Sequence, residues 1–209
     1  EREFTVPSKW MSQRVMLHFG AVDWSADIYV NDILVGSHTG GFTPFACDIT
    51  DTEQVKAAVE ATISKFGRVD ILMNNAGTGA VAPAEEITDE QFKHELNIDL
   101  FGTFVCAREF GKEMIKANYG RIINIASMYG LVGNMIAGSA PYHAAKGGVV
   151  NLTRALAGEW GKHGITVNSI CPGYFYTELT TATLDTEYFQ DMAKRSIPLG
   201  RYGREGELN

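Results

Sequence analysis

The chain has 209 residues, of which 45% are apolar and 21% are charged, a balance typical of a soluble globular protein. This length fits one ordinary domain, or one domain with an appendage, and suffices to bury a core. The formal net charge of -7 provides no positive field for phosphate backbones or anionic lipids. We therefore expect neither nucleic acid nor a membrane surface as a partner.

Cysteine usage and apolar runs narrow the class further. Cys47, Cys106 and Cys171 are widely spaced, form no Cys-x-x-Cys pattern and have no nearby histidine pair. They indicate neither a disulfide framework nor a zinc site, so we expect no bound metal. No apolar run is long enough to span a bilayer, and the N-terminus lacks a secretory signal pattern. We expect a cytoplasmic protein.

The first part of the chain, residues 1–47, has the pattern of β structure. Two runs, 14–22 and 27–35, are rich in Val, Ile, Phe and Tyr, as strands are. Asn31-Asp32 interrupts the second run, and this dipeptide tolerates the positive φ of a two-residue hairpin. We therefore predict a β-hairpin or β-sandwich fragment here.

The second part, residues 48–209, alternates short apolar runs with long helical patterns. The expected strands are 69–73, 121–126 and 165–171, and the expected helices are 51–66, 101–117 and 144–162. In the first helix Val55, Val59 and Ile63 share one face, and Asp51 is placed as an N-cap. Strand, helix and strand in regular order predict βαβ units and a parallel sheet, so we place the domain boundary near Asp48.

Tyr142 and Lys146 are one helical turn apart, so both side chains project from one face. A phenol with an unperturbed pKa of about 10 is a poor base at neutral pH, but a neighbouring cation lowers that pKa. Such a tyrosine can exchange a proton with a substrate oxygen while a hydride moves at carbon. Alone, the spacing is a weak indication, because a surface pair gives the same pattern.

Small or hydrogen-bonding residues stand at the ends of all three expected strands. Asn74-Asn75-Ala76-Gly77 follows the first, Ser127 ends the second, and Pro172-Gly173 follows the third. The carboxyl edge of a parallel sheet is where ligands bind, so these residues and the Tyr/Lys pair are expected to meet there. Together they favour a functional site over a surface pair.

These motifs, in this order and spacing, resemble the short-chain dehydrogenase/reductase family from about Asp48 to the end of the chain. The resemblance implies an α/β fold with a Rossmann-like, doubly wound parallel sheet. It implies an oxidoreductase that moves a hydride between NAD or NADP and a small-molecule alcohol or carbonyl substrate. A homo-oligomer is expected if the family's helix interface forms.

The resemblance also implies residue roles. Tyr142 would be the general acid/base, Lys146 would lower its pKa and hold the nicotinamide ribose, and Ser127 would bind the substrate oxygen. The implied cofactor-binding residues are Asp48, Asn74, Ala76, Gly77, Tyr142, Lys146, Pro172, Gly173 and Thr177. Of these, Asp48 corresponds to the adenine edge, and Asn74 and Gly77 to the floor under the adenosine ribose. Thr177 is equally compatible with an ordinary turn threonine.

Asp99 departs from the family pattern. It stands where the family usually has the asparagine of Asn-x-x-Gly, which holds a water in the proton relay to the lysine. An aspartate accepts hydrogen bonds but cannot donate one unless it is protonated. We expect Asp99 to be a catalytic-site residue that pairs with Lys146, in an altered relay.

The glycine-rich turn of the family, Thr-Gly-x-x-x-Gly-x-Gly, has no good match. The nearest stretch, 39–46, has Pro44 and Ala46 where glycines are required. Without this turn, backbone amides cannot approach a pyrophosphate at a helix N-terminus, so we expect impaired NAD or NADP binding. The family's last helix and strand are also missing after Asn209, so the sheet is expected to be incomplete at both edges.

Residues 1–47 resemble a fragment of the sugar-binding jelly-roll domain of β-galactosidase/β-glucuronidase-type glycoside hydrolases. The resemblance rests on 4–7, Trp10, 14–24, 29–31 and 35–45. Two alternatives to the oxidoreductase therefore stay open: a carbohydrate-binding fragment, and an inactive chimeric or truncated product. Polyols, sugar acids and keto compounds are all compatible substrates, although the local sequence of residues 127–142 resembles that of gluconate 5-dehydrogenases. The choice between NAD and NADP is open.

Overall fold

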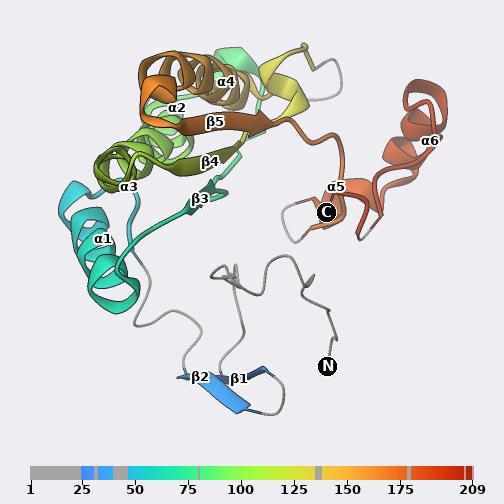
Figure 1. Cartoon of the computed structure of the whole chain (residues 1–209). Coiled ribbons are helices and arrows are strands. Elements are labelled where there is room, and N and C mark those ends of the chain that lie inside the picture. Colours follow the sequence, from blue (N-terminus) through green and yellow to red (C-terminus); the bar gives the residue numbers. More distant parts are fainter. Residues whose placement is uncertain are drawn as a thin grey trace. The chain divides into compact units, whose positions relative to one another are not determined.

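The computed structural model describes residues 25–30, 33–39, 47–79, 81–134, 138–177, 180–204 and 206–208. The chain divides into two compact units, 1–46 and 47–209, close to the predicted boundary. In the first unit, β1 (Ser25–Val30) and β2 (Ile33–Thr39) pair antiparallel (Figure 1). The predicted run 14–22 and the segment around Pro44 lie outside the described residues. This one pair of strands does not identify a jelly roll, so that assignment stays a prediction.

The second unit contains a parallel sheet, as predicted. Strands β3 (Ile71–Asn74), β4 (Gly120–Ile125) and β5 (Ile165–Ile170) lie in the order β3-β4-β5. The register pairs Leu72 with Ile122 and Ile122 with Val167. Figure 1 shows the three arrows side by side and pointing in one direction. The α/β class is therefore confirmed, and the carboxyl ends of all three strands meet at one edge.

Helices connect and follow these strands. They are α1 (Thr52–Phe66), α2 (Asp89–Leu96), α3 (Thr103–Ala117), α4 (Ala140–Trp160), the short α5 (Thr181–Leu184) and α6 (Glu187–Ser196). Asp51 caps α1 as predicted, accepting from the amides of Glu53 at 2.9 Å and Gln54 at 3.2 Å. The sequence analysis did not predict α2 or the π-helical turn Asn97–Gly102 that joins it to α3.

The main core lies between the sheet and helices α3 and α4. Ile122 of β4 is fully buried and packs in one cluster with Met114 of α3 and Leu156 of α4. Because successive strand residues point to opposite faces, Ile71 and Met73 of β3 share the other face, and they are 61% and 56% exposed. The two crossover helices therefore cover one side of the sheet, as right-handed βαβ connections require.

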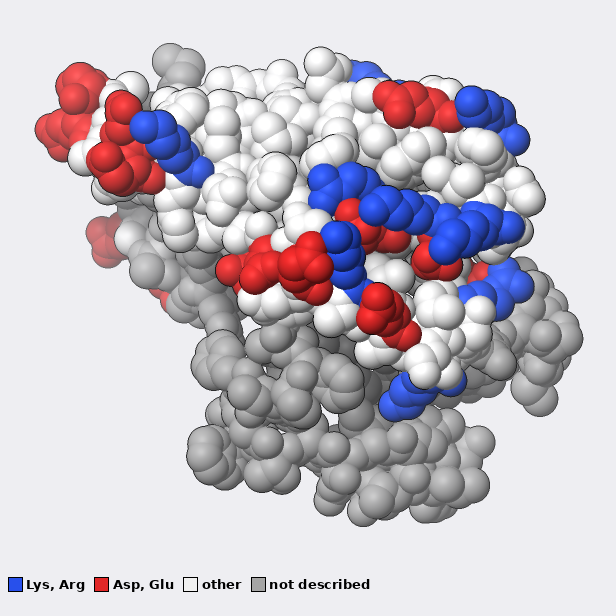
Figure 2. Space-filling model, turned by 90° about the vertical axis from the view of Figure 1, so that its left-hand side faces the viewer, with Lys and Arg blue, Asp and Glu red and all other residues white. Residues whose placement is uncertain are grey.

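Charged side chains of both signs are interspersed on the face that Figure 2 turns to the viewer. Helices α1 and α3 carry ion pairs at i,i+3 spacing, between Glu53 and Lys56 at 2.7 Å and between Glu113 and Lys116 at 2.6 Å. Such exposed pairs each contribute less than about 1 kcal/mol. Within the described residues, no helix has both the length and the apolar character of a membrane span.

Candidate active site

The loops that follow β4 and β5 lie side by side at the carboxyl edge of the sheet. The amide of Ala126 donates to the carbonyl of Ile170 at 2.8 Å, and the amide of Met128 donates to the carbonyl of Pro172 at 3.0 Å. These bonds continue the parallel pairing beyond the last strand residues. They fix Ser127 beside Pro172, at the edge where parallel sheets bind ligands.

Ser127 and Tyr142 meet at this edge. Ser127 is 7% exposed, and its Oγ accepts from the amide of Tyr129 at 3.2 Å, which orients the side chain. Tyr142 stands in the first turn of α4 and forms a side-chain hydrogen bond with Ser127. One turn later, the Nζ of Lys146 lies 5.6 Å from the centroid of the Tyr142 ring. The structure thus brings together the three residues that the sequence predicted to converge.

A buried carboxylate holds Lys146. The Lys146 Nζ lies 3.1 Å from Oδ2 of Asp99 and donates to the carbonyl of Ile125, also at 3.1 Å. Asp99 is fully buried in the π-helical turn, and its Oδ1 accepts from the amide of Thr78 at 2.7 Å. The predicted pairing of Asp99 with Lys146 is therefore present. Both charged groups are removed from water, so each one's desolvation penalty is offset by its interaction with the other.

This pairing changes the electrostatics of Tyr142. Burial raises the pKa of the Tyr142 phenol, the hydrogen bond with Ser127 lowers it, and the charges of Asp99 and Glu95 raise it again. Glu95 lies one helical turn before Asp99 and is 1% exposed. The net direction in this arrangement is a raised pKa, and the role of Lys146 in lowering it stays a prediction. Asp99 neutralises the ammonium, and the phenol is buried beside acidic groups.

Gly77 borders the Lys146–Asp99 pair. A Cβ at this position would lie 3.1 Å from the Lys146 Nζ and 3.2 Å from Oδ2 of Asp99. Glycine therefore leaves open the space beside the ammonium, and the structure brings this predicted cofactor residue into the cluster. Ala76, immediately before it, is exposed in the loop that follows β3.

Asn74 joins a polar network that the sequence analysis missed. Its Nδ2 donates to Oδ1 of Asn124 at 2.8 Å, and Nδ2 of Asn124 donates to Oγ1 of Thr153 at 2.9 Å. The network ties β3, β4 and α4 together beneath the site. The signal was available, because Asn124 stands at a buried position of the strand, between two isoleucines, where an amide needs partners.

The remaining predicted cofactor residues occupy loops. Asp48 lies in an exposed turn before α1, and its Oδ1 accepts from the amide and hydroxyl of Thr50 at 2.8 and 2.7 Å. Thr177 is exposed, and its amide donates to Oγ1 of Thr180 at 2.9 Å. Pro172 and Gly173 lie beside Met128, next to Ser127.

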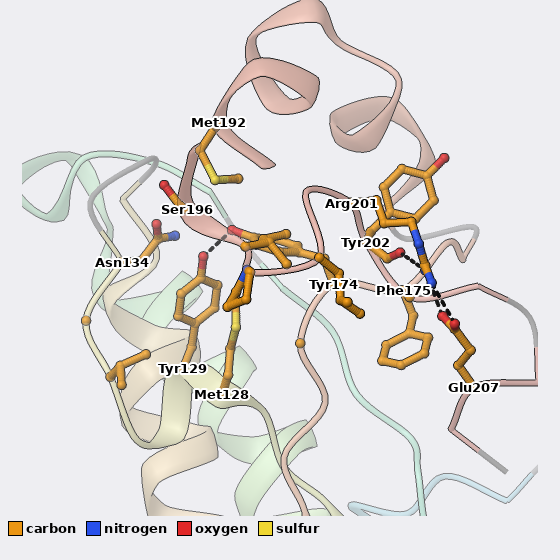
Figure 3. Close-up of a pocket in the computed structure, with 17 residues that line it drawn as sticks. Met128, Tyr129, Asn134, Tyr174, Phe175, Met192, Ser196, Arg201, Tyr202 and Glu207 are labelled. Carbon is orange, nitrogen blue, oxygen red and sulfur yellow. Dashed lines mark hydrogen bonds and ion pairs between the residues drawn. The ribbon is translucent and has the colours of Figure 1, made fainter. Parts of the chain in front are cut away.

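A pocket of about 930 Å³ opens directly beyond the edge of the sheet (Figure 3). Its walls come from the loop after Ser127, the loop after Pro172, and α6 with the segment that follows it. The hydroxyls of Tyr129 and Tyr174 meet in its wall. The sequence analysis did not predict this pocket, because its walls are brought together by packing between distant segments.

The fold and site define a class: a parallel α/β protein with a serine, a tyrosine and a lysine gathered at the carboxyl edge of its sheet. A family model described as short chain dehydrogenase matches residues 32–188. The chain therefore belongs to the short chain dehydrogenase family. The match begins before Asp48, and the glycoside hydrolase resemblance of residues 1–47 gains no support from it.

Named relatives agree with this membership. The chain is 39% identical to a D-threitol dehydrogenase of Mycolicibacterium smegmatis, over 83% of this chain and 66% of the relative. It is 37% identical to a gluconate 5-dehydrogenase of Gluconobacter oxydans, over 77% of this chain and 62% of the relative. The chain thus spans less than two thirds of the length of each.

Solved structures show the same similarity. A gluconate 5-dehydrogenase from Burkholderia cenocepacia, in complex with NADP and tartrate, superimposes with a TM-score of 0.72 at 35% identity. That match covers 75% of this chain and 61% of the other. A short-chain type dehydrogenase/reductase from Mycobacterium marinum gives a TM-score of 0.74 at 34% identity, over 81% and 66%.

Proposed function

We propose that this protein is an NAD(P)-dependent oxidoreductase that transfers a hydride between the cofactor and an alcohol or carbonyl substrate. The observation that carries the proposal is the convergence of Ser127, Tyr142 and Lys146 at the carboxyl edge of the sheet. The family supports the reaction class, and a related structure contains NADP. A carbohydrate-binding fragment would not require a buried Lys/Asp pair beside a half-buried tyrosine.

The described residues fit the nicotinamide-ribose end of such a cofactor. Gly77 leaves the space beside the Lys146 ammonium open, and ammonium and phenol groups suit the hydroxyls of a ribose. Bound there, the nicotinamide would supply or accept the hydride. We assign Lys146 and Tyr142 to the nicotinamide ribose, Asn74 and Gly77 to the floor under the adenosine ribose with Ala76 between them in the same loop, and Asp48 to the adenine edge. Pro172, Gly173 and Thr177 are assigned to the rest of the cofactor.

The protein residues handle the proton. Ser127 positions the substrate oxygen, and Tyr142 donates its proton to that oxygen when a carbonyl is reduced. Because the pKa of Tyr142 is raised, the phenol is protonated at neutral pH and is prepared for reduction. Oxidation of an alcohol requires the phenolate and is expected to be faster at alkaline pH. Asp99 acts on this step through Lys146 as a positioning residue.

Replacing Tyr142 tests the proposal. Tyr142→Phe removes the transferable proton and keeps the ring, so turnover should disappear while the affinity for NADH and NADPH is retained. The absorbance of the reduced cofactor measures turnover, and calorimetric titration measures affinity. Ser127→Ala is the matched control, since it should slow turnover without abolishing it. Undiminished turnover in Tyr142→Phe would overturn the proposal.

We also propose that the 209-residue chain binds cofactor weakly. Pro44 and Ala46 stand where the family has glycines of the pyrophosphate turn, so the backbone donors for the pyrophosphate are lost. The residual hydrogen bonds contribute about 1 kcal/mol each, against an association cost of about 4 kcal/mol or more. Micromolar binding of NADH or NADPH by the 209-residue chain would contradict this. Self-association through the family's helix interface stays a prediction.

The names of the relatives cover several substrate classes. They include a D-threitol dehydrogenase, a gluconate 5-dehydrogenase and a 3-oxoacyl-[acyl-carrier-protein] reductase. A sugar acid or polyol remains compatible with the local resemblance of 127–142. The lining of the pocket is the feature that can separate these classes.

A further inference from the structure

The pocket beyond Ser127 has predominantly apolar walls. Met128 and Tyr129 line it on one side, Tyr174 and Phe175 on the next, and Met192 and Leu199 close it from α6 and the following segment. Figure 3 shows the hydroxyls of Tyr129 and Tyr174 meeting between Met128 and Met192. Tyr129 of the pocket wall donates its amide to Ser127 Oγ, and its phenol lies close enough to Tyr142 for the two to interact electrostatically. A substrate whose oxygen meets Ser127 and Tyr142 would therefore have its substituent beside this space.

Among the described residues that line the pocket, Arg201 is the one basic residue. Its Nη1 and Nη2 donate to Oε2 and Oε1 of Glu207 at 2.9 and 2.8 Å, a bidentate pairing. Nη1 also donates to the carbonyl of Tyr202 at 2.9 Å. Figure 3 shows the guanidinium directed at Glu207 and away from Tyr129 and Met128. The two Nη atoms thus face Glu207 in an end-on fork that engages three of the five guanidinium N–H donors, and the Glu207 carboxylate compensates the guanidinium charge.

Glu207 is held in its charged form. The hydrogen bonds from Arg201, followed by that from the Arg204 amide at 2.6 Å, lower the pKa of the Glu207 carboxyl to about 2. Arg201 stays protonated at any working pH. The pair is thus neutral overall throughout the pH range of an assay. The polar groups at the other end of the pocket, the Asn134 amide and the Ser196 hydroxyl, are neutral as well.

We propose that this pocket selects uncharged secondary alcohols or ketones with an apolar substituent, and that Glu207 excludes carboxylate substrates by occupying Arg201. The inference rests on the oxidoreductase function proposed above and specifies its substrate class. A carboxylate that entered would lose its hydration without gaining a cation, whereas an apolar substituent gains by leaving water. We therefore expect sugar acids to be poor substrates of this protein, although one relative is named gluconate 5-dehydrogenase.

Two small ligands test the selection directly. 1-Phenylethanol and mandelate share the ring and the hydroxyl, and they differ in carrying a methyl group or a carboxylate. Ligand-observed NMR titration of the 209-residue chain needs no cofactor, so it does not depend on the pyrophosphate turn. We expect 1-phenylethanol to bind at least about tenfold more tightly than mandelate. Equal or tighter binding of mandelate would overturn the inference.

A pair of variants tests the role of Glu207. Glu207→Gln keeps the shape of the side chain and releases the guanidinium, so mandelate affinity should rise about tenfold while 1-phenylethanol affinity stays unchanged. Arg201→Gln combined with Glu207→Gln is the matched control, and in it the gain should disappear. An unchanged mandelate affinity in Glu207→Gln, or a gain that survives in the double variant, would overturn the assignment.

Turnover separates this inference from the proposed function. If the selectivity holds but no hydride is exchanged with 1-phenylethanol or acetophenone, at cofactor concentrations raised until the rate no longer depends on them, the oxidoreductase proposal fails and the pocket assignment stands. If gluconate is turned over and 1-phenylethanol neither binds nor reacts, the oxidoreductase proposal stands and the pocket assignment fails.

Discussion

Two ion pairs flank the site, and they differ in burial. The side chains of Lys146 and Asp99 are 6% and 0% exposed, whereas those of Arg201 and Glu207 are 31% and 41% exposed. The first pair is locked between α4 and the π-helical turn, and the second lies in the segment after α6. Both bring opposite charges within 3.1 Å, so distance alone does not distinguish them.

Burial gives the two pairs different consequences. In the buried pair, removing one partner leaves a charge without water or counter-ion, so the fold depends on both residues. In the partly exposed pair, water replaces a lost partner at little cost. We therefore expect Lys146–Asp99 to govern stability and proton chemistry, and Arg201–Glu207 to govern which ligands enter the pocket.

The largest expected effect is the loss of one buried partner. Lys146→Met leaves Asp99 as an unpaired buried charge and should lower the free energy of unfolding by about 3–5 kcal/mol. Urea denaturation measures this. Adding Asp99→Leu removes the stranded charge, so the double variant should recover most of the stability without recovering turnover. If Lys146→Met were as stable as the wild type, the buried ion pair would not differ from the partly exposed one in its effect on stability.

Removing only the charge of Asp99 tests its electrostatic role. Asp99→Asn takes a negative charge away from Tyr142 and leaves Lys146 uncompensated, so the pKa of Tyr142 should fall. The rate of alcohol oxidation would then reach its maximum at lower pH. The shift can be measured without turnover, from the absorbance of phenolate during a pH titration. Subtracting the titration of the double variant Asp99→Asn, Tyr142→Phe from that of Asp99→Asn isolates the signal of Tyr142. Asp48→Asn is the control: because that carboxylate is exposed, its replacement should leave the pKa of Tyr142 unchanged.

Crowding beside the buried pair should have an intermediate effect. In Gly77→Ala the new Cβ would lie 3.1 Å from Nζ of Lys146 and 3.2 Å from Oδ2 of Asp99, so the pair must shift. We expect a loss of about 1 kcal/mol in the free energy of unfolding. Gly158→Ala is the matched control on α4, where a Cβ meets nothing within 4 Å, and it should stabilise by about 0.5–1 kcal/mol. Equal effects at both glycines would show that the space beside Lys146 is not restricted.

Local rules account for what the sequence could predict. The parallel strands followed from short apolar runs with polar ends, and Tyr142 met Lys146 because one helical turn separates them. The Asp99–Lys146 pair followed from one departure in a motif. The raised pKa of Tyr142 could not be predicted, because it depends on burial and on Glu95, which no motif marked. The pocket walls depend on the packing of α6 against loops far away in the chain.

The smallest effect is expected at the partly exposed pair. Glu207→Gln should change the melting temperature by about 3 °C or less at neutral pH, because a surface pair contributes little. A carboxyl with a lowered pKa stabilises the fold above its unfolded value, near 4.3, and this contribution is lost as the pH falls toward the folded value of about 2. The melting temperatures of wild type and Glu207→Gln should therefore differ slightly between pH 5 and 8 and converge below about pH 3. Melting scans at these pH values test this, with Glu113→Gln as a control in the pair with Lys116 on α3, which is also partly exposed. If Glu207→Gln lost as much stability as Lys146→Met, exposure would not distinguish the two ion pairs. The segment after α6 would then depend on its ion pair as the core depends on Lys146–Asp99.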